Sequence, residues 1–357
     1  MAAQEDLEDV SLEIDNETFR FWEKITVKQS LDTFSTVEFS APFEATRKEF
    51  RDKFRPFKFQ PVVVKSGENR MFTGRIVGIN PSVTPDRKSV TVTAYALPAA
   101  LHDCTPPSKV PGTEDPFPLE FKKLKLQAIA GVLCAPFGVN VDFRGEDGRA
   151  FDKIKIDPAK KIFEFLADLA QHRNFVFTDN TIGDLLCWRS VQPGNPVARL
   201  RDDEQPVTKV EANFNPQDYY SEITGFAPVK RGRKGSRFTA KNPFLPDVLR
   251  PRSIRFDKIE KGDAPEATQA MLGRMFADMV SYKVDIATWR QPDGEIWRAN
   301  TTLNLLAPDA MVYNEYEFII RDVEFNVSKQ SRDATLTLVL PGVFDAQVPE
   351  RLPWDEN

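Results

Sequence analysis

Hydrophobic and polar residues alternate through much of the first hundred positions, and this period of two is typical of strands with one buried face. The alternation is interrupted over 43–54, a segment opening with Phe-Glu-Ala-Thr-Arg-Lys-Glu-Phe that we expect to contain a short helix. The expected strands are Val10–Ile14, Ile25–Lys28, Thr36–Ala41, Arg55–Phe59, Pro61–Lys65 and Met71–Asn80.

Two distant segments, 73–94 and 319–340, share one hairpin pattern: an alternating strand, a polar turn and another alternating strand. They align without a gap when the chain is shifted by 246 positions, the distance from Arg75 to Arg321. We interpret the repeat as one β module that occurs twice; a shared hairpin pattern without common descent is the alternative. The identical pairs are Arg75/Arg321, Val77/Val323, Asn80/Asn326, Ser82/Ser328 and Thr91/Thr337.

The chain changes character after residues 105–118, which contain five prolines and indicate a linker, so we place a domain boundary there. Apolar residues then recur at helical spacing from Leu126 to Leu133, and Pro136 should end this helix.

A second helix in this part should begin at Asp157, because Asp is a preferred N-cap and Pro158 suits the first turn. Phe175–Trp188 has the pattern of a hairpin. Residues 119–200 are therefore expected to form a small α+β domain.

Alternation returns at 207–214 and 219–226, and again over 281–340, where a Gln-Pro-Asp-Gly turn at 291–294 separates strands over Lys283–Trp289 and Trp297–Leu306. These segments should form the second β module, which includes the second copy of the repeated hairpin.

An insertion at about 229–280 interrupts this module with a basic loop and a helix. Asp263 should cap the helix, with Glu266 three residues later. We expect the methionine stripe of this helix to pack on the β module, while an adaptable binding surface is the alternative. The stripe consists of Met271, Met275 and Met279.

Composition narrows the class of protein. The 357 residues suffice for two to four domains, and the 28 Phe residues are expected to fill several small cores. A net charge of −5 is unlike that of a dedicated nucleic-acid binder. The acidic N-terminus lacks the features of a signal peptide, and no apolar run approaches the roughly 20 residues of a membrane span. We therefore expect synthesis in the cytoplasm and no membrane association.

No residue pattern indicates catalysis, a cofactor or a metal site. Of the two histidines, His102 is in no triad context, and His172 suits the end of a helix. Residues 202–204, Asp-Asp-Glu, are more typical of a solvated turn than of a catalytic pair. The three cysteines have no paired spacing and fit reduced thiols. We assign no catalytic, cofactor-binding or metal-binding residue.

The sharpest charge feature is a basic stretch from Val229 to Phe256, with nine Lys or Arg residues and Asp247 as its one acid. It could contact a phosphate backbone, face an acidic partner or neighbouring subunit, or be a solvated loop. Trp354, near the C-terminal end, is either loose or an anchor onto a partner. The candidate partner contacts are Lys230, Arg231, Arg233, Lys234, Arg237 and Trp354.

Three stretches have a distinctive sequence. Ala128–Val141 contains Leu-Cys-Ala-Pro-Phe-Gly-Val, Asp293–Trp297 is Asp-Gly-Glu-Ile-Trp, and the C-terminal part contains Leu-Pro-Gly-Val-Phe and Val-Pro-Glu. With these stretches and its elements in this order, the chain resembles the baseplate hub proteins of Mu-like contractile-tailed bacteriophages, the tail protein P family, which is related to VgrG-like hubs. The family's similar stretches are Leu-Cys-Ala-Pro-Tyr-Gly-Val, an Asp-Gly-x-Leu-Trp region and the same closing pattern. The N-terminal region and the 229–280 insertion match least.

This resemblance implies a fold and an assembly. It implies an α+β, β-dominated chain with two tube-type β-barrel domains from an internal duplication, a small α+β middle domain and a helical insertion. Three such chains would form a pseudo-six-fold ring that joins the tail tube to the central spike. The expected domains are 1–104, 105–204, 205–228 with 281–344, the inserted 229–280, and a tail at 345–357.

The resemblance also implies partners and a location. We expect a homotrimer in the virion, made in the host cytoplasm, that contacts the tail tube or tube-initiator protein, the spike and the baseplate wedge proteins. DNA would pass through its channel without specific binding. Two alternatives stay open: a tail-associated cell-wall hydrolase, and the hub of a related contractile injection or secretion machine.

Overall fold

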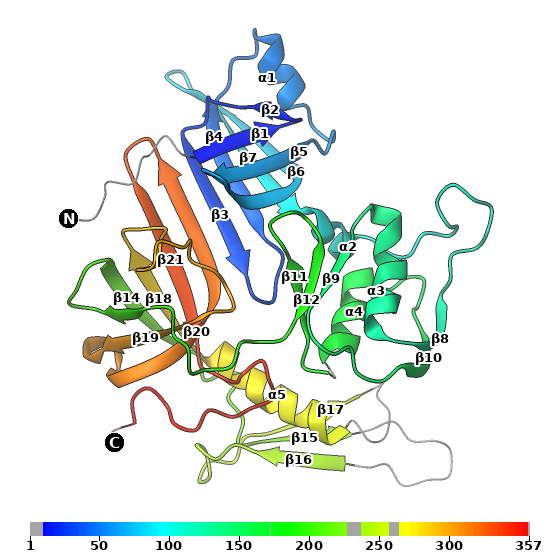
Figure 1. Ribbon diagram of the computed structural model, residues 1–357, viewed down its shortest axis with the longest axis vertical. Coiled ribbons are helices and arrows are strands. Elements are labelled where there is room, and N and C mark those ends of the chain that lie inside the picture. The colour runs from blue at the N-terminus through cyan, green and yellow to red at the C-terminus, as the bar shows by residue number, and fades with distance from the viewer. Residues whose placement is uncertain (1–9, 172, 227–236, 257–263, 356–357) are drawn as a thin grey trace. The chain divides into compact units, whose positions relative to one another are not determined.

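The computed structural model describes residues 10–171, 173–226, 237–256 and 264–355 (Figure 1). These residues divide into two compact units. Unit 1 holds the residues up to Phe165, together with Phe177–Cys187 and Val323–Ala334. Unit 2 holds Leu166–Val176, Trp188–Asp322 and the residues from Thr335 onward. Strands dominate both units, which confirms the β-dominated class.

An antiparallel sheet in the order β3–β4–β7–β6–β5–β1–β2 forms the first β module. Its strands alternate between buried apolar and exposed polar residues, as Val37 and Phe39 of β4 illustrate. Five of the six predicted strands of this region are confirmed. The strands are β1 (Val10–Ile14), β2 (Glu17–Thr18), β3 (Lys24–Ser30), β4 (Thr36–Pro42), β5 (Pro61–Ser66), β6 (Asn69–Val83) and β7 (Lys88–Ala96).

Phenylalanine fills the core of this module at its α1 end. The predicted helix within 43–54 is present as α1 (Lys48–Lys53), and it buries Phe50, while Phe54 is buried directly after it. The Phe19 ring lies 6.1 Å from that of Phe50 and 5.4 Å from that of Phe54, both edge-on. Edge-on pairs of this kind suit the aromatic quadrupole, so three rings form one compact cluster.

The strand predicted over Arg55–Phe59 is wrong. Pro56 and Phe57 form a turn, and both Phe57 (φ 61°) and Phe59 (φ 49°) have left-handed backbone conformations. An extended strand needs negative φ throughout, so the alternating pattern does not become a strand there.

Residues 97–188 contain the predicted mixture of helices and strands. The predicted first helix is confirmed as α3 (Leu126–Cys134), followed by the 3₁₀ turn η3 (Ala135–Phe137), and the predicted hairpin is confirmed as β11 (Val176–Asp179) and β12 (Leu185–Trp188). The other elements are η2 (Leu97–Ala99), α2 (Ala100–Asp103), β8 (Glu120–Leu124), β9 (Val141–Phe143), β10 (Phe151–Lys155) and α4 (Ile162–Gln171).

The predicted start of the second helix at Asp157 is wrong, because α4 begins at Ile162. The Asp157 carboxylate instead accepts a hydrogen bond from the Ala159 N–H at 2.8 Å, and its carbonyl accepts one from Lys160 at 2.9 Å. Asp157 therefore stabilises a separate turn before the helix. The same side chain could have capped a helix, and the hydrogen bonds of this turn take the place of that cap.

In unit 2 the main sheet has the order β14–β18–β21–β20–β19–β13, with β13 parallel to β19. The predicted turn at 291–294 is present, with Gly294 at φ 91°. The strand expected from Trp297 begins only at Thr302, and the Trp297 side chain is fully buried. The elements are β13 (Arg199–Arg201), β14 (Val207–Phe214), β18 (Val280–Ile286), β19 (Thr302–Ala307), η4 (Pro308–Ala310), β20 (Val312–Ser328) and β21 (Arg332–Val339).

A second, three-stranded sheet of unit 2 has the order β16–β15–β17, and helix α5 packs on it. The expectation of a loop over 229–256 is wrong for its described parts, because they contain two strands. β15, expected in the second β module, pairs with them instead. These elements are β15 (Glu222–Phe226), β16 (Arg237–Lys241), β17 (Pro251–Arg255) and α5 (Ala264–Met279).

Helix α5 buries most of its predicted methionine stripe. Met275 and Met279 are buried and Met271 is half-buried, which confirms that the stripe packs within the fold. The helix packs mainly on the β16–β15–β17 sheet, whereas packing on the second β module was expected. Asp263, the predicted N-cap, lies outside the described residues. Within those residues, no helix is both long and apolar enough to cross a membrane.

The two repeated segments are both hairpins, β6–β7 and β20–β21, but their turns differ. Four residues separate the first pair of strands and three separate the second. The first turn is closed by a hydrogen bond from the Thr84 N–H to the Arg87 carbonyl, and the second by one from the Ser328 N–H to the Ser331 carbonyl. In the gapless alignment the counterparts of Thr84 and Arg87 are residues 330 and 333, so the two turn bonds do not coincide. The shared pattern is confirmed at the level of the strands, and the duplication stays a prediction.

Close packing of β15 on α5 gives the first prediction. A Cβ at Gly225 would lie 2.1 Å from the Thr268 Oγ1 and 2.5 Å from a Phe256 ring carbon, both on buried side chains. We expect Gly225→Ala to lower the free energy of unfolding by roughly 1–3 kcal/mol. Urea unfolding followed by circular dichroism measures this.

Gly131→Ala is the matched control, because open space surrounds its Cβ position in α3. Alanine has a higher helix propensity than glycine, so this variant should be more stable by about 0.5–1 kcal/mol. Equal effects of the two substitutions would contradict the close packing of β15 on α5.

Candidate interaction surfaces

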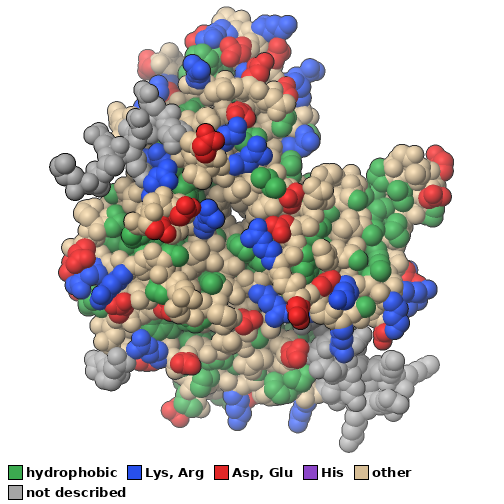
Figure 2. All heavy atoms as spheres, in the orientation of Figure 1, with side chains coloured by type: hydrophobic (Ala, Val, Ile, Leu, Met, Phe, Trp, Pro, Cys, Tyr) green, Lys and Arg blue, Asp and Glu red, His purple; other side chains and the backbone are tan. Residues whose placement is uncertain are grey.

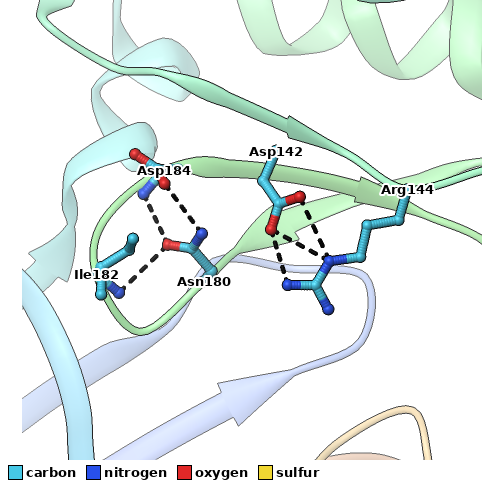
Figure 3. Close-up of polar contacts among 5 residues, drawn as sticks. All are labelled: Asp142, Arg144, Asn180, Ile182 and Asp184. Atoms are coloured by element: carbon cyan, nitrogen blue, oxygen red, sulfur yellow. Dashed lines mark hydrogen bonds and ion pairs between the residues drawn. The ribbon is translucent and has the colours of Figure 1, made fainter.

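The turn of the β11–β12 hairpin is held by one side chain. The Asn180 Oδ1 accepts hydrogen bonds from the backbone N–H groups of Ile182 (3.2 Å) and Asp184 (2.9 Å), and its Nδ2 donates to the Asp184 carboxylate at 3.1 Å (Figure 3). Asn is suited to this because its amide can donate and accept at once. The turn therefore has a fixed shape rather than that of a solvated loop.

Beside the hairpin, Asp142 of β9 forms an ion pair at the surface with Arg144, which directly follows this strand (Figure 3). The Arg144 Nη2 lies 2.7 Å from the Asp142 Oδ2, and the Nε approaches the same carboxylate oxygen at 3.1 Å. An exposed pair of this kind contributes little to stability.

Buried polar contacts join the hairpin to the first β module within unit 1. The Thr178 hydroxyl donates to the carbonyl of Thr33 at 2.6 Å and lies 3.0 Å from that of Ser30. The Asp179 carboxylate accepts the backbone N–H of Ser35 at 2.6 Å. Because Asp179 is only 9% exposed, its carboxylate has lost most of its hydration. Burial therefore raises the pKa of Asp179 to about 6, although the hydrogen bonds from Ser35 oppose the shift.

Each described sequence candidate for acid–base chemistry makes an ordinary structural contact. The His102 ring lies against Phe163, with 4.0 Å between ring centroids, and burial lowers the pKa of His102. His172 lies outside the described residues. Asp203 forms an exposed ion pair with Arg201 at 2.9 Å in a turn, as expected for 202–204.

The described residues also offer no assembled metal site: no group of three His, Cys, Asp or Glu side chains is placed to hold an ion. The three cysteines are free thiols, and burial raises the pKa of Cys134 to about 12. This thiol therefore stays protonated and unreactive at neutral pH.

Of the nine basic residues predicted as a cluster, only some can be placed. Lys230, Arg231, Arg233 and Lys234 lie outside the described residues, and Arg237 is exposed at the start of β16. Arg250 has a structural role, because its guanidinium donates to the carbonyls of Pro216 (3.0 Å) and Tyr219 (2.8 Å). The described part of the stretch is thus partly built into the fold, and its contact with a partner stays a prediction.

Trp354 lies on its own chain rather than loose in solvent. Its ring is edge-on to Phe214, with centroids 5.2 Å apart, and the neighbouring Pro353 carbonyl accepts the Tyr313 N–H at 3.3 Å. These residues border an apolar groove of about 550 Å³ in unit 2, a size within the range of peptide-anchoring and ligand sites. The groove is lined by Phe214, Asn215, Pro216, Tyr219, Met279, Met311, Tyr313 and Trp354.

Sequence reasoning missed a second basic and aromatic surface in unit 1. Phe57 is 91% exposed and Phe59 52% exposed, with Arg55 and Lys58 beside them. Figure 2 shows Lys and Arg side chains on the end of the unit that carries α1, with acidic side chains among them. The sequence feature that could have indicated this surface is the interleaving of basic and aromatic residues over 47–59. It was interpreted as part of a helix and a strand.

The buried carboxyl of Asp179 predicts how stability depends on pH. Its pKa is raised in the folded state, so the folded protein binds the proton more tightly than the unfolded chain. The resulting stability is present below pH 4 and is lost as the pH rises through about 6. Asp179→Asn keeps an acceptor for Ser35 and removes the charge. Between pH 4 and 7.5 it should gain roughly 2–3 kcal/mol relative to the wild type.

Urea unfolding of both proteins over this pH range tests the expectation, with Asp86→Asn on the exposed β6–β7 turn as the control. A difference between Asp179→Asn and wild type that does not change with pH would contradict it.

Among known protein families, one family model matches the middle of the chain. Residues 99–189 match the second domain of the gp44-like baseplate hub proteins. This segment overlaps the predicted middle domain at 105–204 and contains the β11–β12 hairpin. The chain is also 25% identical over 335 residues to the baseplate hub protein gp44 of Escherichia phage Mu, covering 90% of this chain and 82% of that protein.

Solved structures extend the likeness to the whole fold. The 43 kDa tail protein of prophage MuSo2 from Shewanella oneidensis has a TM-score of 0.79 and 22% identity, covering 94% of this chain and 99% of that one. A lower likeness, with a TM-score of 0.55 and 11% identity over 92% of this chain and 76% of the other, extends to the E. coli c3393 protein. That protein is a component of the type VI secretion system and is structurally similar to the T4 tail proteins gp27 and gp5. The chain is therefore similar to phage baseplate hub and tail proteins, in its sequence over residues 99–189 and over 335 aligned residues, and in its fold over nearly its whole length.

Proposed function

We propose that the chain is the non-enzymatic hub of a contractile tail baseplate and acts as a homotrimer. The observation that supports this most directly is one chain with two β modules, each containing a long hairpin of the same pattern, β6–β7 and β20–β21. Three copies would supply six similar modules. Such a ring matches a six-fold tail tube on one side and keeps three-fold symmetry for a spike on the other.

In this proposal the tail tube or tube-initiator protein, the central spike and the wedge proteins are the partners. DNA passes through the channel without specific binding, which agrees with the net charge of −5. The protein would be made in the host cytoplasm and end in the virion. We retain the domain boundaries at 1–104, 105–204, 205–228 with 281–344, 229–280 and 345–357 as part of the proposal, except that β15 joins the sheet of the insertion.

The open edge of the unit 2 sheet is the feature that ring formation would use. Among the described strands, β14 has β18 on one side and no strand on the other. The Asn215 N–H donates to the Met279 carbonyl at 2.8 Å. In an antiparallel pair, every second residue directs its backbone N–H and C=O groups to the partner strand, so the residues of β14 in step with Asn215 bond to β18. Ala212 belongs to the other set, and its N–H points to the open edge. Pairing this edge with a strand of a neighbouring copy would satisfy its free backbone groups.

The basic residues and Trp354 are proposed as contacts to other baseplate proteins. Arg237 opens β16 as an exposed cation, and Trp354 borders the apolar groove with Met311 and Tyr313, which are about half exposed. Aromatic and arginine side chains are enriched in protein interfaces, so these two surfaces fit partner proteins.

A second candidate function is the hub of a related injection or secretion machine, which the likeness to the c3393 protein favours. We prefer the phage tail because its family model and its sequence relative are both baseplate hub proteins. The same matches favour a structural role over a cell-wall hydrolase.

Mass in solution tests the assembly. We expect light scattering of the purified protein to give three times the 40.5 kDa chain mass over a range of concentrations. Ala212→Pro should shift this mass towards the monomer, because it removes an outward N–H and leaves the ladder to β18 intact.

Ala212→Val keeps the N–H and suits a strand, so it is the matched control and should remain trimeric. A monomer at every concentration, also after the spike protein is added, would overturn the hub proposal. A trimer that Ala212→Pro leaves unchanged would exclude the β14 edge as its contact.

A further inference from the structure

Unit 1 presents an unusual surface, called here the Phe57 surface and made of Arg55, Phe57, Lys58, Phe59, Arg75 and Val77. Its three apolar side chains are exposed by 91% (Phe57), 52% (Phe59) and 43% (Val77). Val77 is turned outward by a β-bulge between Ile76 and Gly78. Aromatic rings exposed to this degree and gathered with a third apolar side chain mark an interaction site.

The backbone holds these rings in a conformation that aromatic residues avoid. Phe57 (φ 61°) and Phe59 (φ 49°) are left-handed, a region in which bulky residues are outliers. The loop is fixed from several sides: Arg75 Nη1 donates to the Phe59 carbonyl at 3.1 Å, and Gln60 Nε2 donates to the Asp52 carbonyl at 2.9 Å. Strain that the surroundings maintain at an exposed position is typical of a preorganised contact.

Shape and charge define what this surface can bind. A cleft of about 90 Å³ lies between the loop and β6, lined by Phe57, Phe59 and Val77 among others. This is far below the roughly 300–1,000 Å³ of small-molecule sites, and it suits one aliphatic side chain. Arg55 has no ion pair among the described residues, and Lys58 has Asp15 at 3.7 Å. The surface therefore fits an acidic peptide with one apolar anchor.

The chain itself contains such a peptide. Residues 4–9, Gln-Glu-Asp-Leu-Glu-Asp, place Leu7 between two acidic residues on each side. We propose that residues 1–9 of one copy dock on the Phe57 surface of a second copy. Leu7 enters the cleft, and the flanking carboxylates face Arg55, Lys58 and Arg75. This inference rests on the proposed homotrimer, because it needs a neighbouring copy.

Reach within one chain favours a second copy over the same copy as the donor. Strand β1 runs from Val10, paired with Ser66, to Ile14, paired with Val62, and the next residue, Asp15, contacts Lys58. The surface thus lies at the far end of β1, roughly 14 Å from Val10. Leu7 precedes Val10 by three residues and extends at most about 11 Å from it.

Peptide binding tests the docking directly. A labelled synthetic peptide with the sequence of residues 1–9 is titrated with the full chain carrying Leu7→Ser, and fluorescence anisotropy is recorded. We expect saturable binding that weakens as salt is raised, because the contact is between opposite charges. Adding Phe57→Asn to this chain should weaken binding about ten-fold or more, as for a central anchor. Asn tolerates the left-handed backbone, so the loop keeps its conformation.

Leu249→Ser is the matched control, because Leu249 is 85% exposed on unit 2, and binding should stay within about two-fold. A peptide with Leu7→Ser should bind at least about ten-fold more weakly than the natural sequence. Absent binding, or binding that Phe57→Asn leaves unchanged, would overturn the docking.

Binding of a single-stranded oligonucleotide or anionic vesicles that Phe57→Asn abolishes, in place of the peptide, would also overturn it. Since the peptide is supplied separately, a failure here leaves the trimer measurement unaffected, and a monomeric chain can still bind the peptide.

Discussion

Backbone hydrogen bonding across the β20–β21 hairpin is the interaction on which both β modules depend. Its residues 323–334 belong to unit 1, where the strand order places β20 next to β3, and the rest belongs to unit 2. In unit 1 the Thr26 hydroxyl donates to the Asn326 side chain at 2.8 Å, and Arg332 donates to the Ser66 hydroxyl at 2.7 Å. The hairpin thus covers an edge that β3 would otherwise expose, because unpaired strand edges invite association with other chains.

Strand prediction succeeded wherever a period of two was the only signal. Val10–Ile14 is observed with the predicted bounds, because alternation directly reflects which face is buried. Prediction failed where a local interaction competed. Asp157 could have capped a helix, yet it serves a separate turn, and Arg55–Phe59 alternates while its φ angles are left-handed. Neither outcome is encoded in hydrophobicity, since the Asp157 turn depends on hydrogen bonds to the nearby Ala159 and Lys160, and the Phe59 carbonyl accepts a hydrogen bond from Arg75 of another strand.

Partner strands were also beyond prediction. β15 has the alternation expected of the second β module, but its neighbours are β16 and β17, strands from the segment expected to be a loop. Periodicity indicates that a strand exists and which face is apolar; pairing depends on the three-dimensional path. The same limit applies to the candidate surfaces. The importance of Asp179 arises from its burial beside Ser35, and that of Phe57 from its exposure, which residue type alone does not reveal.

The two β modules of one chain have different surfaces, and in the proposed ring this difference has a consequence for assembly. Six identical modules would meet in six identical contacts, whereas three copies of a two-module chain form two alternating kinds of contact. The unit 1 module carries the basic and aromatic Phe57 surface, and unit 2 carries the open β14 edge and the apolar groove beside Trp354. In such a ring one kind of contact joins the two modules of one copy, and the other kind joins neighbouring copies. The contact between copies can combine backbone pairing at the β14 edge with charge and an apolar anchor at the Phe57 surface. Because these two mechanisms are not interchangeable, a copy in the wrong orientation leaves a strand edge or an aromatic ring uncovered, and correct closure of the ring is favoured.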